Sequence, residues 1–335
     1  MDHSISCTQL KRRKFLKAAM ATLVSGGYGS QALAMQKQNS HGIPTRPLGQ
    51  TGEQIPIVGL GGYHIGVPEE GAAIRIMHEA IDGGMTFFDN AWDYHDGGSE
   101  EVMGKALAMG GRREKVFLMT KVCDRDYQGA KRQLEQSLRR LKTDHLDLWQ
   151  FHEINWAVDS QWLFEKGGIR AAIEAQKEGK VRYIGFTGHR KPSHHLKLLA
   201  QSFSWDTVQM PINLLDAHYD SFQKKVVPVC RDKKTSVIGM KALAGGTLPK
   251  QLNIPASICR RYALSLPITS LVCGIQSREN LQQDLAMARS FQPVTPQEME
   301  QLLAQTEERG SDGKLEPWKT TNYGGQYHRD QHPKG

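Results

Sequence analysis

The sequence has few cysteines and no cysteine motif. Five occur among 335 residues, at positions 7, 123, 230, 259 and 273, and none are spaced as CxxC or CxxxC. Scattered cysteines of this kind neither supply the ligand spacing of a zinc finger nor form a disulfide-stabilised scaffold. We expect them to pack as small buried hydrophobic residues, although an oxidising compartment would permit one bridge.

A long apolar run is also missing. The apolar stretch from Phe15 to Val24 is about half the roughly 20 residues that a membrane-spanning helix needs, so no stable membrane span is expected. Basic residues 11–14 precede it, and Ala32-Leu33-Ala34 is a small-x-small cleavage site, as in an export signal. Arg12-Arg13-Lys14-Phe15-Leu16-Lys17 resembles a twin-arginine signal. Residues 1–34 are therefore predicted to engage the twin-arginine export machinery and direct the protein to the periplasm, the alternative being a basic disordered tail.

Without that segment, the charge is only mildly positive. The formal charge is +8, and residues 1–34 hold five Lys or Arg and one Asp, so the remainder carries +4. No continuous basic stripe with interleaved aromatic residues occurs in that remainder, so no nucleic-acid partner is expected. The composition, 39% hydrophobic and 23% charged, is that of an ordinary globular enzyme or binding protein.

Short apolar runs alternate with amphipathic stretches along most of the chain. The runs are apolar throughout, as strands buried on both faces of a parallel sheet are. The stretches between them follow the helical period, as in Ile74, Met77 and Ile81. Gly83 and Gly179 are predicted to end two of these helices in the left-handed conformation. The predicted strands are Ile57 to Gly61, Thr86 to Asp89, Val116 to Lys121, Leu146 to His152, Val181 to Thr187, Thr207 to Met210, Val237 to Met240 and Ser270 to Gly274.

Eight strand and helix units over roughly 230 residues match a closed (β/α)8 TIM barrel of the α/β class. The alternative is an open doubly wound sheet, but Gly59-Leu60-Gly61-Gly62-Tyr63-His64 lacks the third glycine of the nucleotide-binding turn. Thr45 to Leu48 and Ile55 to Val58, separated by a turn, predict an N-terminal β-hairpin. The expected order is the signal at 1–34, a linker at 35–43, the barrel at 44–310 and a C-terminal tail at 311–335.

Three successive predicted strands end in ionisable residues. These are Asp89, Lys121 and His152, and Tyr94 follows five residues after Asp89. Neighbouring strands lie about 4.8 Å apart, and barrel enzymes carry their chemistry at the C-terminal ends of the strands. Each residue alone could be an ion-pair partner, a loop aromatic or a core histidine, but together they predict one catalytic site.

These segments are similar to motifs of the aldo-keto reductase family. Phe88-Asp89-Asn90-Ala91-Trp92-Asp93-Tyr94 resembles the family's Asp-x-Ala-x-x-Tyr, Thr120-Lys121 its Thr-Lys, and Gln150-Phe151-His152 its strand-end histidine. The resemblance covers residues 44–290 or so and implies a barrel enzyme that uses NADP(H) or NAD(H). Its partner would be a small carbonyl or alcohol substrate. The tail from Asp312 resembles that of a twin-arginine-exported subgroup, in which it would form a substrate loop over the barrel mouth.

The four residues have a common chemical rationale. Hydride transfer to a carbonyl carbon leaves charge on the oxygen, so a proton donor must lie beside it. Tyr94 is the predicted acid and base, with Lys121 lowering its pKa from the usual value of about 10. Asp89 would hold Lys121, while His152 would hydrogen-bond the substrate oxygen.

The resemblance also implies which residues hold the nicotinamide half of the cofactor. Gly62 and Tyr63 follow the first predicted strand, Asp89 ends the second, and all three would line its site. Thr187 and Gly188 stand where the family has Ser-Asn, so the hydroxyl is kept and the amide is lost. Gln209 matches the family's glutamine, and Ile212 stands where an aromatic ring usually stacks.

The phosphate side of the cofactor is less regular. Lys241 would neutralise the pyrophosphate, the alternative being an ordinary solvated lysine. A predicted helix start, which suits an anion, would hold the adenosine phosphate. Its residues include no cation at the two positions where NADP-dependent members carry one, 276 and 280, so the choice between NADP and NAD stays open. These residues are Gly274, Gln276, Ser277, Arg278 and Asn280.

No metal site is predicted. His152-Glu153-Ile154-Asn155-Trp156 begins like the zinc motif HExxH but lacks its second histidine. The three histidines at positions 189, 194 and 195 are expected to form a polar loop.

Two functions remain open. The first is an oxidoreductase acting on a small carbonyl or alcohol, with a sugar derivative favoured by the polar aromatic residues Tyr63, His64, Trp92 and Trp156. Export would require the cofactor to be bound before translocation and to stay bound. The second is a nicotinamide-binding redox sensor or partner subunit with little turnover.

Overall fold

The computed structural model describes residues 37–321 and 323–332. The predicted signal at 1–34 and the start of the predicted linker lie outside the described residues. Within them, no helix combines the length and apolar character that a bilayer crossing demands.

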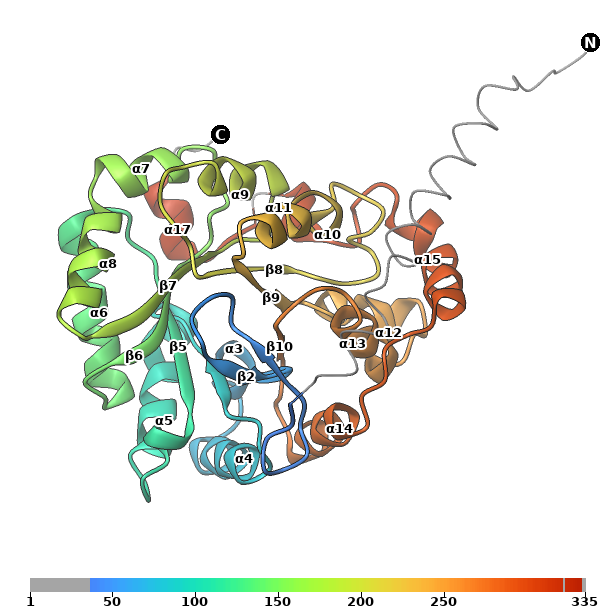
Figure 1. Cartoon of the computed structure of the whole chain (residues 1–335), viewed down its shortest axis with the longest axis horizontal. Helices are drawn as coiled ribbons and strands as arrows, with labels where there is room; N and C mark the ends of the chain where they lie inside the picture. Colours follow the sequence, from blue (N-terminus) through green and yellow to red (C-terminus); the bar gives the residue numbers. More distant parts are fainter. Residues whose placement is uncertain (1–36, 322, 333–335) are drawn as a thin grey trace, which may run out of the picture.

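Eight parallel strands close into a barrel in the order β10-β3-β4-β5-β6-β7-β8-β9, with helices around it (Figure 1). The predicted (β/α)8 barrel is therefore confirmed, and each predicted strand end lies within one residue of the observed one. The barrel strands are β3 (Val58–Gly61), β4 (Phe87–Asp89), β5 (Phe117–Val122), β6 (Leu146–Phe151), β7 (Val181–Thr187), β8 (Thr207–Pro211), β9 (Ser236–Met240) and β10 (Ser270–Cys273).

The helices pack one apolar face on the barrel. In α6, Leu134, Leu138 and Leu141 are buried against the sheet, and Asp126 caps the first turn by accepting a hydrogen bond from Gly129 N. The described helices are α3 (Gly62–Ile65), α4 (Glu70–Asp82), η1 (Tyr94–Gly97), α5 (Gly98–Leu107), η2 (Arg113–Lys115), α6 (Tyr127–Leu141), α7 (Asp159–Glu165), α8 (Gly168–Lys177), α9 (Pro192–Leu199), α10 (Phe222–Lys225), α11 (Val227–Asp232), η3 (Ala244–Gly246), α12 (Thr247–Gln251), α13 (Ala256–Leu264), α14 (Arg278–Arg289), α15 (Pro296–Gly310), α16 (Pro317–Thr320) and α17 (Gln326–Gln331).

One predicted helix end is displaced by a residue. Gly179 has the expected positive φ of 73°, but Gly83 has a φ of −88° and the left-handed residue is Gly84, at 90°. Gly83 still donates its N–H to Glu79 O at 2.8 Å. The right-handed helical path therefore extends through Gly83, and the reversal falls on the next glycine.

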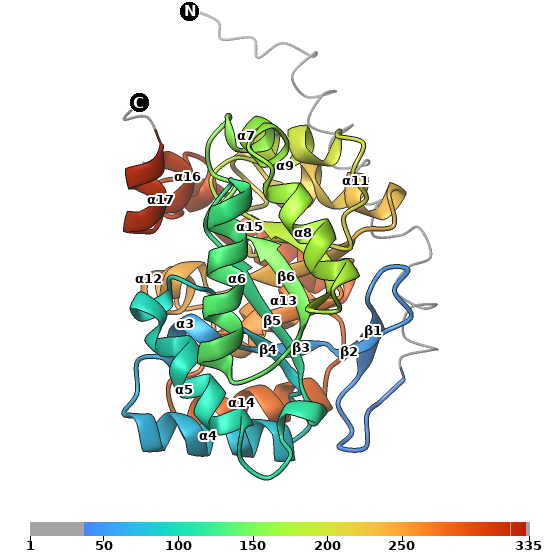
Figure 2. The same ribbon diagram turned by 90° about the vertical axis from the view of Figure 1, so that its left-hand side faces the viewer.

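The predicted hairpin, β1 (Thr45–Pro47) paired antiparallel with β2 (Gln54–Pro56), closes the N-terminal end of the barrel. Two of its apolar residues, Leu48 and Ile55, belong to a buried cluster with barrel residues Phe87, Met119 and Leu148. Figure 2 shows α16 and α17 of the tail on the opposite side of the barrel from the hairpin. The hairpin thus covers one end of the barrel, and α16 and α17 lie at the other.

The tail is anchored by buried polar contacts. Lys319 Nζ lies 2.6 Å from Asp216 Oδ1 and 2.7 Å from Glu316 Oε2, with all three side chains at 1% exposure or less. Asn213 Nδ2 donates to Glu316 Oε1 at 2.9 Å. This network fixes α16 on the loop that follows β8.

Candidate active site

The strand ends bring the four predicted catalytic side chains together at the C-terminal mouth of the barrel. Asp89 ends β4, Lys121 lies near the end of β5, and His152 directly follows β6. Lys121 Nζ forms a buried ion pair with Asp89 and donates to Asn90 O at 2.7 Å and to the Tyr94 hydroxyl at 3.3 Å. Because the ammonium donates to the phenol oxygen, the phenolic proton is left for another acceptor.

His152 completes the group. Its ring centroid lies 5.5 Å from that of Tyr94 in an edge-on arrangement. Its Nδ1 is 3.0 Å from Asp93 Oδ1 and 3.8 Å from Cys123 Sγ. Since Nδ1 faces these groups, Nε2 is the nitrogen that can address a substrate oxygen.

The pKa of Tyr94 moves opposite to the expected direction. Burial of the hydroxyl, and then the carboxylates Asp89, Asp93 and Glu153, raise this pKa well above its usual value of 10.0. The expected lowering of this pKa was wrong, because burial and the nearby carboxylates outweigh the ammonium of Lys121. Tyr94 therefore holds its proton at neutral pH, as a general acid for carbonyl reduction must.

Gln209, the predicted cofactor ligand on β8, faces the same mouth. Its Nε2 donates to Asp89 Oδ2 at 3.3 Å, whereas its buried Oε1 has no hydrogen-bond partner among the described residues. An unpaired buried acceptor is costly, and a carboxamide N–H of a nicotinamide would satisfy it. Thr187, the neighbouring predicted ligand, is buried at the end of β7.

Packing explains why Gly188 replaces the larger family residue. A Cβ at this position would lie 2.6 Å from His195 Nε2 and 2.7 Å from Ile154 O. Two other predicted cofactor positions are equally crowded. A Cβ at Gly62 would lie 2.5 Å from Asp89 O, and a Cβ at Gly274 would lie 2.7 Å from His64 Nδ1. Any side chain at these three positions would push apart the segments that shape the mouth.

Tyr63 and Lys241 both lie at the mouth, in different surroundings. Tyr63 is 54% exposed, with its ring centroid 5.4 Å from that of Tyr94. Lys241 Nζ lies 5.0 Å from the ring centroid of Trp318 and 5.4 Å from that of Tyr323, both on the tail. Burial lowers the pKa of Lys241, so it is not the ordinary solvated lysine of the alternative interpretation.

The predicted adenosine-phosphate residues lie at the start of α14. Ser277 caps this helix, accepting a hydrogen bond from Asn280 N at 3.2 Å, and Gln276 is exposed before it. Arg278 donates to Glu79 Oε2 at 2.8 Å, and its side chain is 72% exposed. Its exposed position leaves it able to exchange Glu79 for a phosphate.

The tail packs onto the mouth aromatics. Tyr327 lies 4.9 Å from Trp92 between ring centroids, and His332 stacks on Trp156 at 4.0 Å. The Tyr327 hydroxyl donates to Asp124 Oδ1 at 2.8 Å. The tail therefore reaches the loops after β4, β5 and β6.

Several residues of the site were not predicted from the sequence. Asp93 and Glu153 adjoin predicted residues, and Cys123 lies two positions after Lys121, but only the fold shows that Asp93 Oδ1 lies 3.0 Å from His152 Nδ1. Glu153 is buried, and its Oε2 accepts a hydrogen bond from Gly325 N of the tail at 2.8 Å. Their position next to strand-end residues was the only available signal.

The predicted polar histidine loop was wrong. His195 lies in α9, fully buried, with ring centroids 5.1 Å from Phe186 and 5.0 Å from Phe222. His189 is also buried, with its N–H donating to Asn155 Oδ1 at 3.0 Å. Burial lowers the pKa of both imidazoles, which keeps them neutral. His195 faces inward because α9 covers the barrel, whereas His189 lies in the loop before α9 and is held by Asn155.

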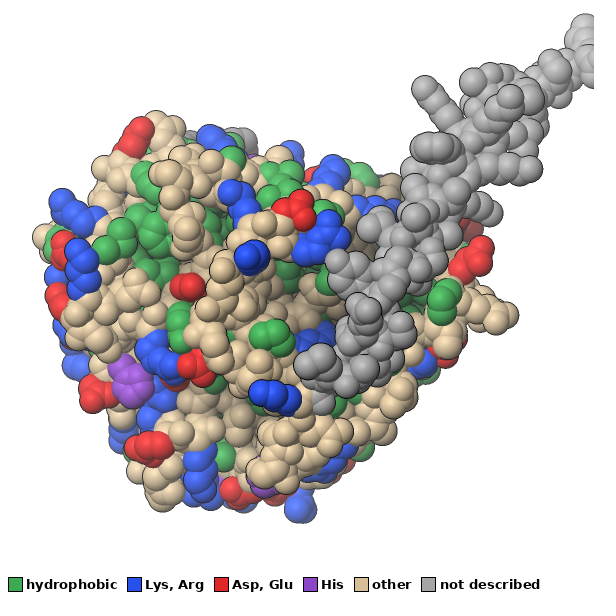
Figure 3. Space-filling view, viewed as in Figure 1, with side chains coloured by type: hydrophobic (Ala, Val, Ile, Leu, Met, Phe, Trp, Pro, Cys, Tyr) green, Lys and Arg blue, Asp and Glu red, His purple; other side chains and the backbone are tan. Residues whose placement is uncertain are grey.

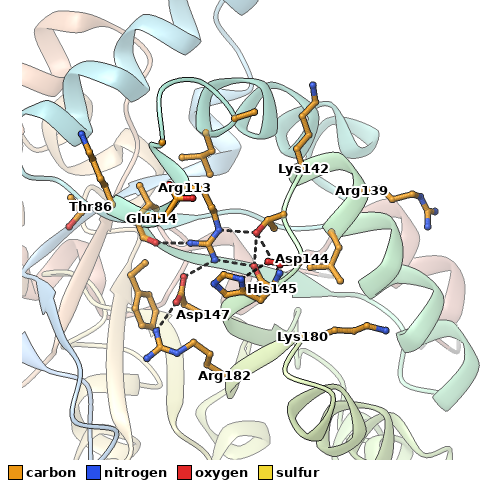
Figure 4. A pocket seen from close by; sticks show the side chains of 18 of the residues that line it. Thr86, Arg113, Glu114, Arg139, Lys142, Asp144, His145, Asp147, Lys180 and Arg182 are labelled. Carbon is orange, nitrogen blue, oxygen red and sulfur yellow. Dashed lines mark hydrogen bonds and ion pairs between the residues drawn. The ribbon is translucent and has the colours of Figure 1, made fainter.

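A separate hollow opens at the N-terminal ends of β4 to β7, lined by residues that include Thr86, Lys180 and Arg182. In Figure 4, Arg113 and Arg182 point toward Asp147. Their nitrogens lie 3.0 and 2.8 Å from its two carboxylate oxygens. None of the four predicted catalytic side chains lines this hollow.

Comparisons with known proteins agree with this geometry. The chain is 36% identical over 230 residues to the oxidoreductase YrpG of Bacillus subtilis, covering 60% of this chain and 67% of that protein. It is 30% identical over 229 residues to L-galactose dehydrogenase of Arabidopsis thaliana, covering 62% of this chain and 68% of that protein.

Solved structures share the fold. The aldo-keto reductase AKR11C1 of Bacillus halodurans, in its holo form, has a TM-score of 0.67 at 24% identity, covering 78% of this chain and 96% of that chain. A Klebsiella pneumoniae aldo/keto reductase in complex with NADP and acetate superimposes with a TM-score of 0.63 at 23% identity, covering 76% and 93%. Residues 57–260 match the model of the aldo/keto reductase family, and the chain therefore belongs to that family of oxidoreductases.

Proposed function

We propose that this protein reduces a small carbonyl compound, or oxidises the corresponding alcohol, with NADP(H) or NAD(H), and that Tyr94 is its general acid and base. The observation that carries the proposal is the contact of Lys121 Nζ with both Asp89 and the Tyr94 hydroxyl, beside His152, at the C-terminal mouth of the barrel. The family membership supports the oxidoreductase class independently.

Each side chain has a defined task in this proposal. A bound nicotinamide supplies or accepts the hydride. Tyr94 donates its proton to the carbonyl oxygen, and Lys121 stabilises the phenolate that remains. His152 orients the oxygen through Nε2 while Asp93 holds Nδ1. Since burial and nearby carboxylates raise the pKa of Tyr94, the phenol holds the proton that reduction of a carbonyl consumes.

The mouth residues fit a nicotinamide cofactor. The unpartnered Oε1 of Gln209 would accept from the carboxamide, and Thr187 would contribute its hydroxyl. Lys241 and the α14 start with Ser277 and Arg278 would hold the phosphates. The NADP complex of the Klebsiella relative supports this class of cofactor.

The substrate is proposed to be a sugar derivative. The mouth presents the exposed ring of Tyr63, and a flat aromatic ring with a polar edge suits the face and hydroxyls of a sugar. The rings of Trp92 and Trp156 lie nearby but contact Tyr327 and His332 of the tail. The relationship to L-galactose dehydrogenase supports the same class.

Export by the twin-arginine route, from the motif at Arg12 and Arg13, remains part of the proposal. That route carries folded proteins, so the cofactor would be loaded before translocation and then retained. The tail supports retention, because Trp318 and Tyr323 cover Lys241. Exhaustive dialysis of purified protein, followed by its nicotinamide absorbance, tests this point: nucleotide should stay bound, and its complete loss would contradict retention.

The decisive test of function is a screen of sugars and aldehydes against nucleotide-loaded protein, comparing the parent with Tyr94→Phe. Removal of the general acid should reduce turnover by about 10²–10⁴, with nucleotide affinity unchanged. Tyr183→Phe is the matched control, since Tyr183 bonds Glu53 at the opposite end of the barrel, and should keep turnover. A parent that binds nucleotide and converts none of the compounds would instead indicate a redox sensor.

A further inference from the structure

Four potential metal ligands meet beside the catalytic histidine, and each comes from a different part of the chain. They are Asp93 after β4, Cys123 after β5, His152 after β6 and His328 on α17 of the tail. One ligand atom from each lies within 4.8 Å of every other. We call this group the tail cluster.

The spacing within the tail cluster is close to that of a tetrahedral site. Zinc bonds of about 2.0–2.3 Å place tetrahedral ligand atoms roughly 3.3–3.8 Å apart. His152 Nδ1 lies 3.0 Å from Asp93 Oδ1 and 3.8 Å from Cys123 Sγ, and His328 Nε2 lies 3.8 Å from Asp93 Oδ2. The ligand atoms lie within 4.8 Å of one another, so shifts on the order of 1 Å and a turn of the Asp93 carboxylate would place all four on one ion.

His328 gives an independent indication that a ligand is missing. Its side chain is fully buried, yet neither Nδ1 nor Nε2 has a hydrogen-bond partner among the described residues. Glu153 Oε2 lies 3.9 Å away, beyond hydrogen-bond range, and the edge of the His152 ring fills the other side. A buried imidazole without partners costs stability, and coordination to a metal would remove that cost.

We propose that the tail cluster binds one divalent ion of the zinc class, which fastens the C-terminal tail to the catalytic mouth. Binding releases the thiol proton of Cys123 to solvent, so a thiolate, a carboxylate and two neutral imidazoles balance the two positive charges. Thiolate and imidazole ligands favour zinc over magnesium or calcium. With four protein ligands, the site is closed and structural.

The ion would also fix the tautomer of His152. Coordination through Nδ1 places the remaining ring proton on Nε2, which then donates to the substrate oxygen. This consequence rests on the proposed function, whereas ion binding itself does not.

The test uses the full chain, stripped with a strong chelator and titrated with Co²⁺. The proposal predicts one equivalent bound, with the visible bands of tetrahedral cobalt and a near-ultraviolet thiolate charge-transfer band, all lost on adding Zn²⁺. The spectrum needs neither nucleotide nor substrate, so its failure is distinguishable from failure of the proposed function. A parent that shows no such bands at saturating Co²⁺ would overturn the proposal.

Variants assign the ligands. Cys123→Ser should abolish the charge-transfer band, and His328→Ala should weaken Co²⁺ binding at least tenfold, with His328→Asn used if the alanine variant does not fold. The matched controls are Cys230→Ser, a buried thiol elsewhere, and His78→Ala, a part-buried histidine on α4 whose ring contacts Ala106 O. Both controls should bind as the parent does. Unchanged binding in the Cys123 and His328 variants would place the ion elsewhere and contradict the proposal.

Discussion

The two ends of this barrel both carry ion pairs at the strand termini, but they differ in how completely their polar atoms are paired. At the N-terminal hollow, Arg113 bonds Thr143, Val116 O, His145 O and Asp147. On the same face, seen in Figure 3, basic and acidic side chains are interspersed. Stability alone accounts for such a fully paired arrangement.

The C-terminal mouth has the opposite character. Among the residues that the structure describes, Gln209 Oε1 and both nitrogens of His328 are buried without hydrogen-bond partners. The Lys121 and Asp89 side chains are 1% and 5% exposed, against 41% for Arg182 in the hollow. Ion pairs alone therefore do not mark a site, and neither does a single unpaired buried atom, since Trp205 Nε1 and Asp284 Oδ2 are also unpaired away from the mouth. The mouth differs because such atoms lie there beside a fully buried ion pair.

The largest expected difference between the two ends comes from removing one lysine. Lys121→Met leaves Asp89 buried without its partner, so the free energy of unfolding should fall by about 3–5 kcal/mol and turnover should disappear. Lys180→Met, which removes a half-exposed partner of Glu135 in the hollow, should cost less than about 1 kcal/mol. Urea unfolding of both variants measures the two losses in the free energy of unfolding. Equal losses would contradict the difference proposed between the two ends of the barrel.

A smaller effect concerns the pH dependence of the contact between tail and mouth. Burial alone would raise the pKa of Asp159, but Arg125 and His332 lower it from 3.8 to about 2. A folded-state pKa below the unfolded value stabilises the protein above pH 4, and that contribution is lost as the pH falls through the folded value. It amounts to about 2 kcal/mol at pH 6 and roughly half of that at pH 3.

Asp159→Asn should therefore be less stable than the parent at pH 6, with a difference that shrinks by about 1 kcal/mol at pH 3. Urea unfolding at both pH values measures it. Asp232→Asn, which removes an exposed partner of Arg231, is the control and should show no such trend. A difference that is independent of pH would contradict the coupling of Asp159 to Arg125 and His332.

The smallest effect is expected in the hollow itself. Arg182→Ala removes a half-exposed ion pair with Asp147, while Arg113 still satisfies that carboxylate. The loss of stability should be about 1 kcal/mol or less, and turnover should remain within twofold of the parent. Thermal unfolding and a turnover assay check both, and a large loss of turnover would assign the hollow a functional role.

The sequence was sufficient to predict the strands and the residues that lie at their ends. The eight strands were predicted because their residues are apolar on both faces, and Asp89, Lys121 and His152 were placed together because parallel strands end at one mouth. The direction of the Tyr94 pKa shift was wrong because it depends on burial and on three carboxylates that only the fold assembles. His328 lies 176 positions after His152 in the sequence and could be linked to it only through the folded tail.

The most direct measurement is a crystal structure of the protein with a nicotinamide cofactor and a carbonyl compound. We expect the nicotinamide ring at the C-terminal mouth beside Gln209, with the carbonyl oxygen within hydrogen-bond distance of the Tyr94 hydroxyl. A cofactor bound in the N-terminal hollow, or a Tyr94 hydroxyl turned away from the carbonyl oxygen, would contradict the account.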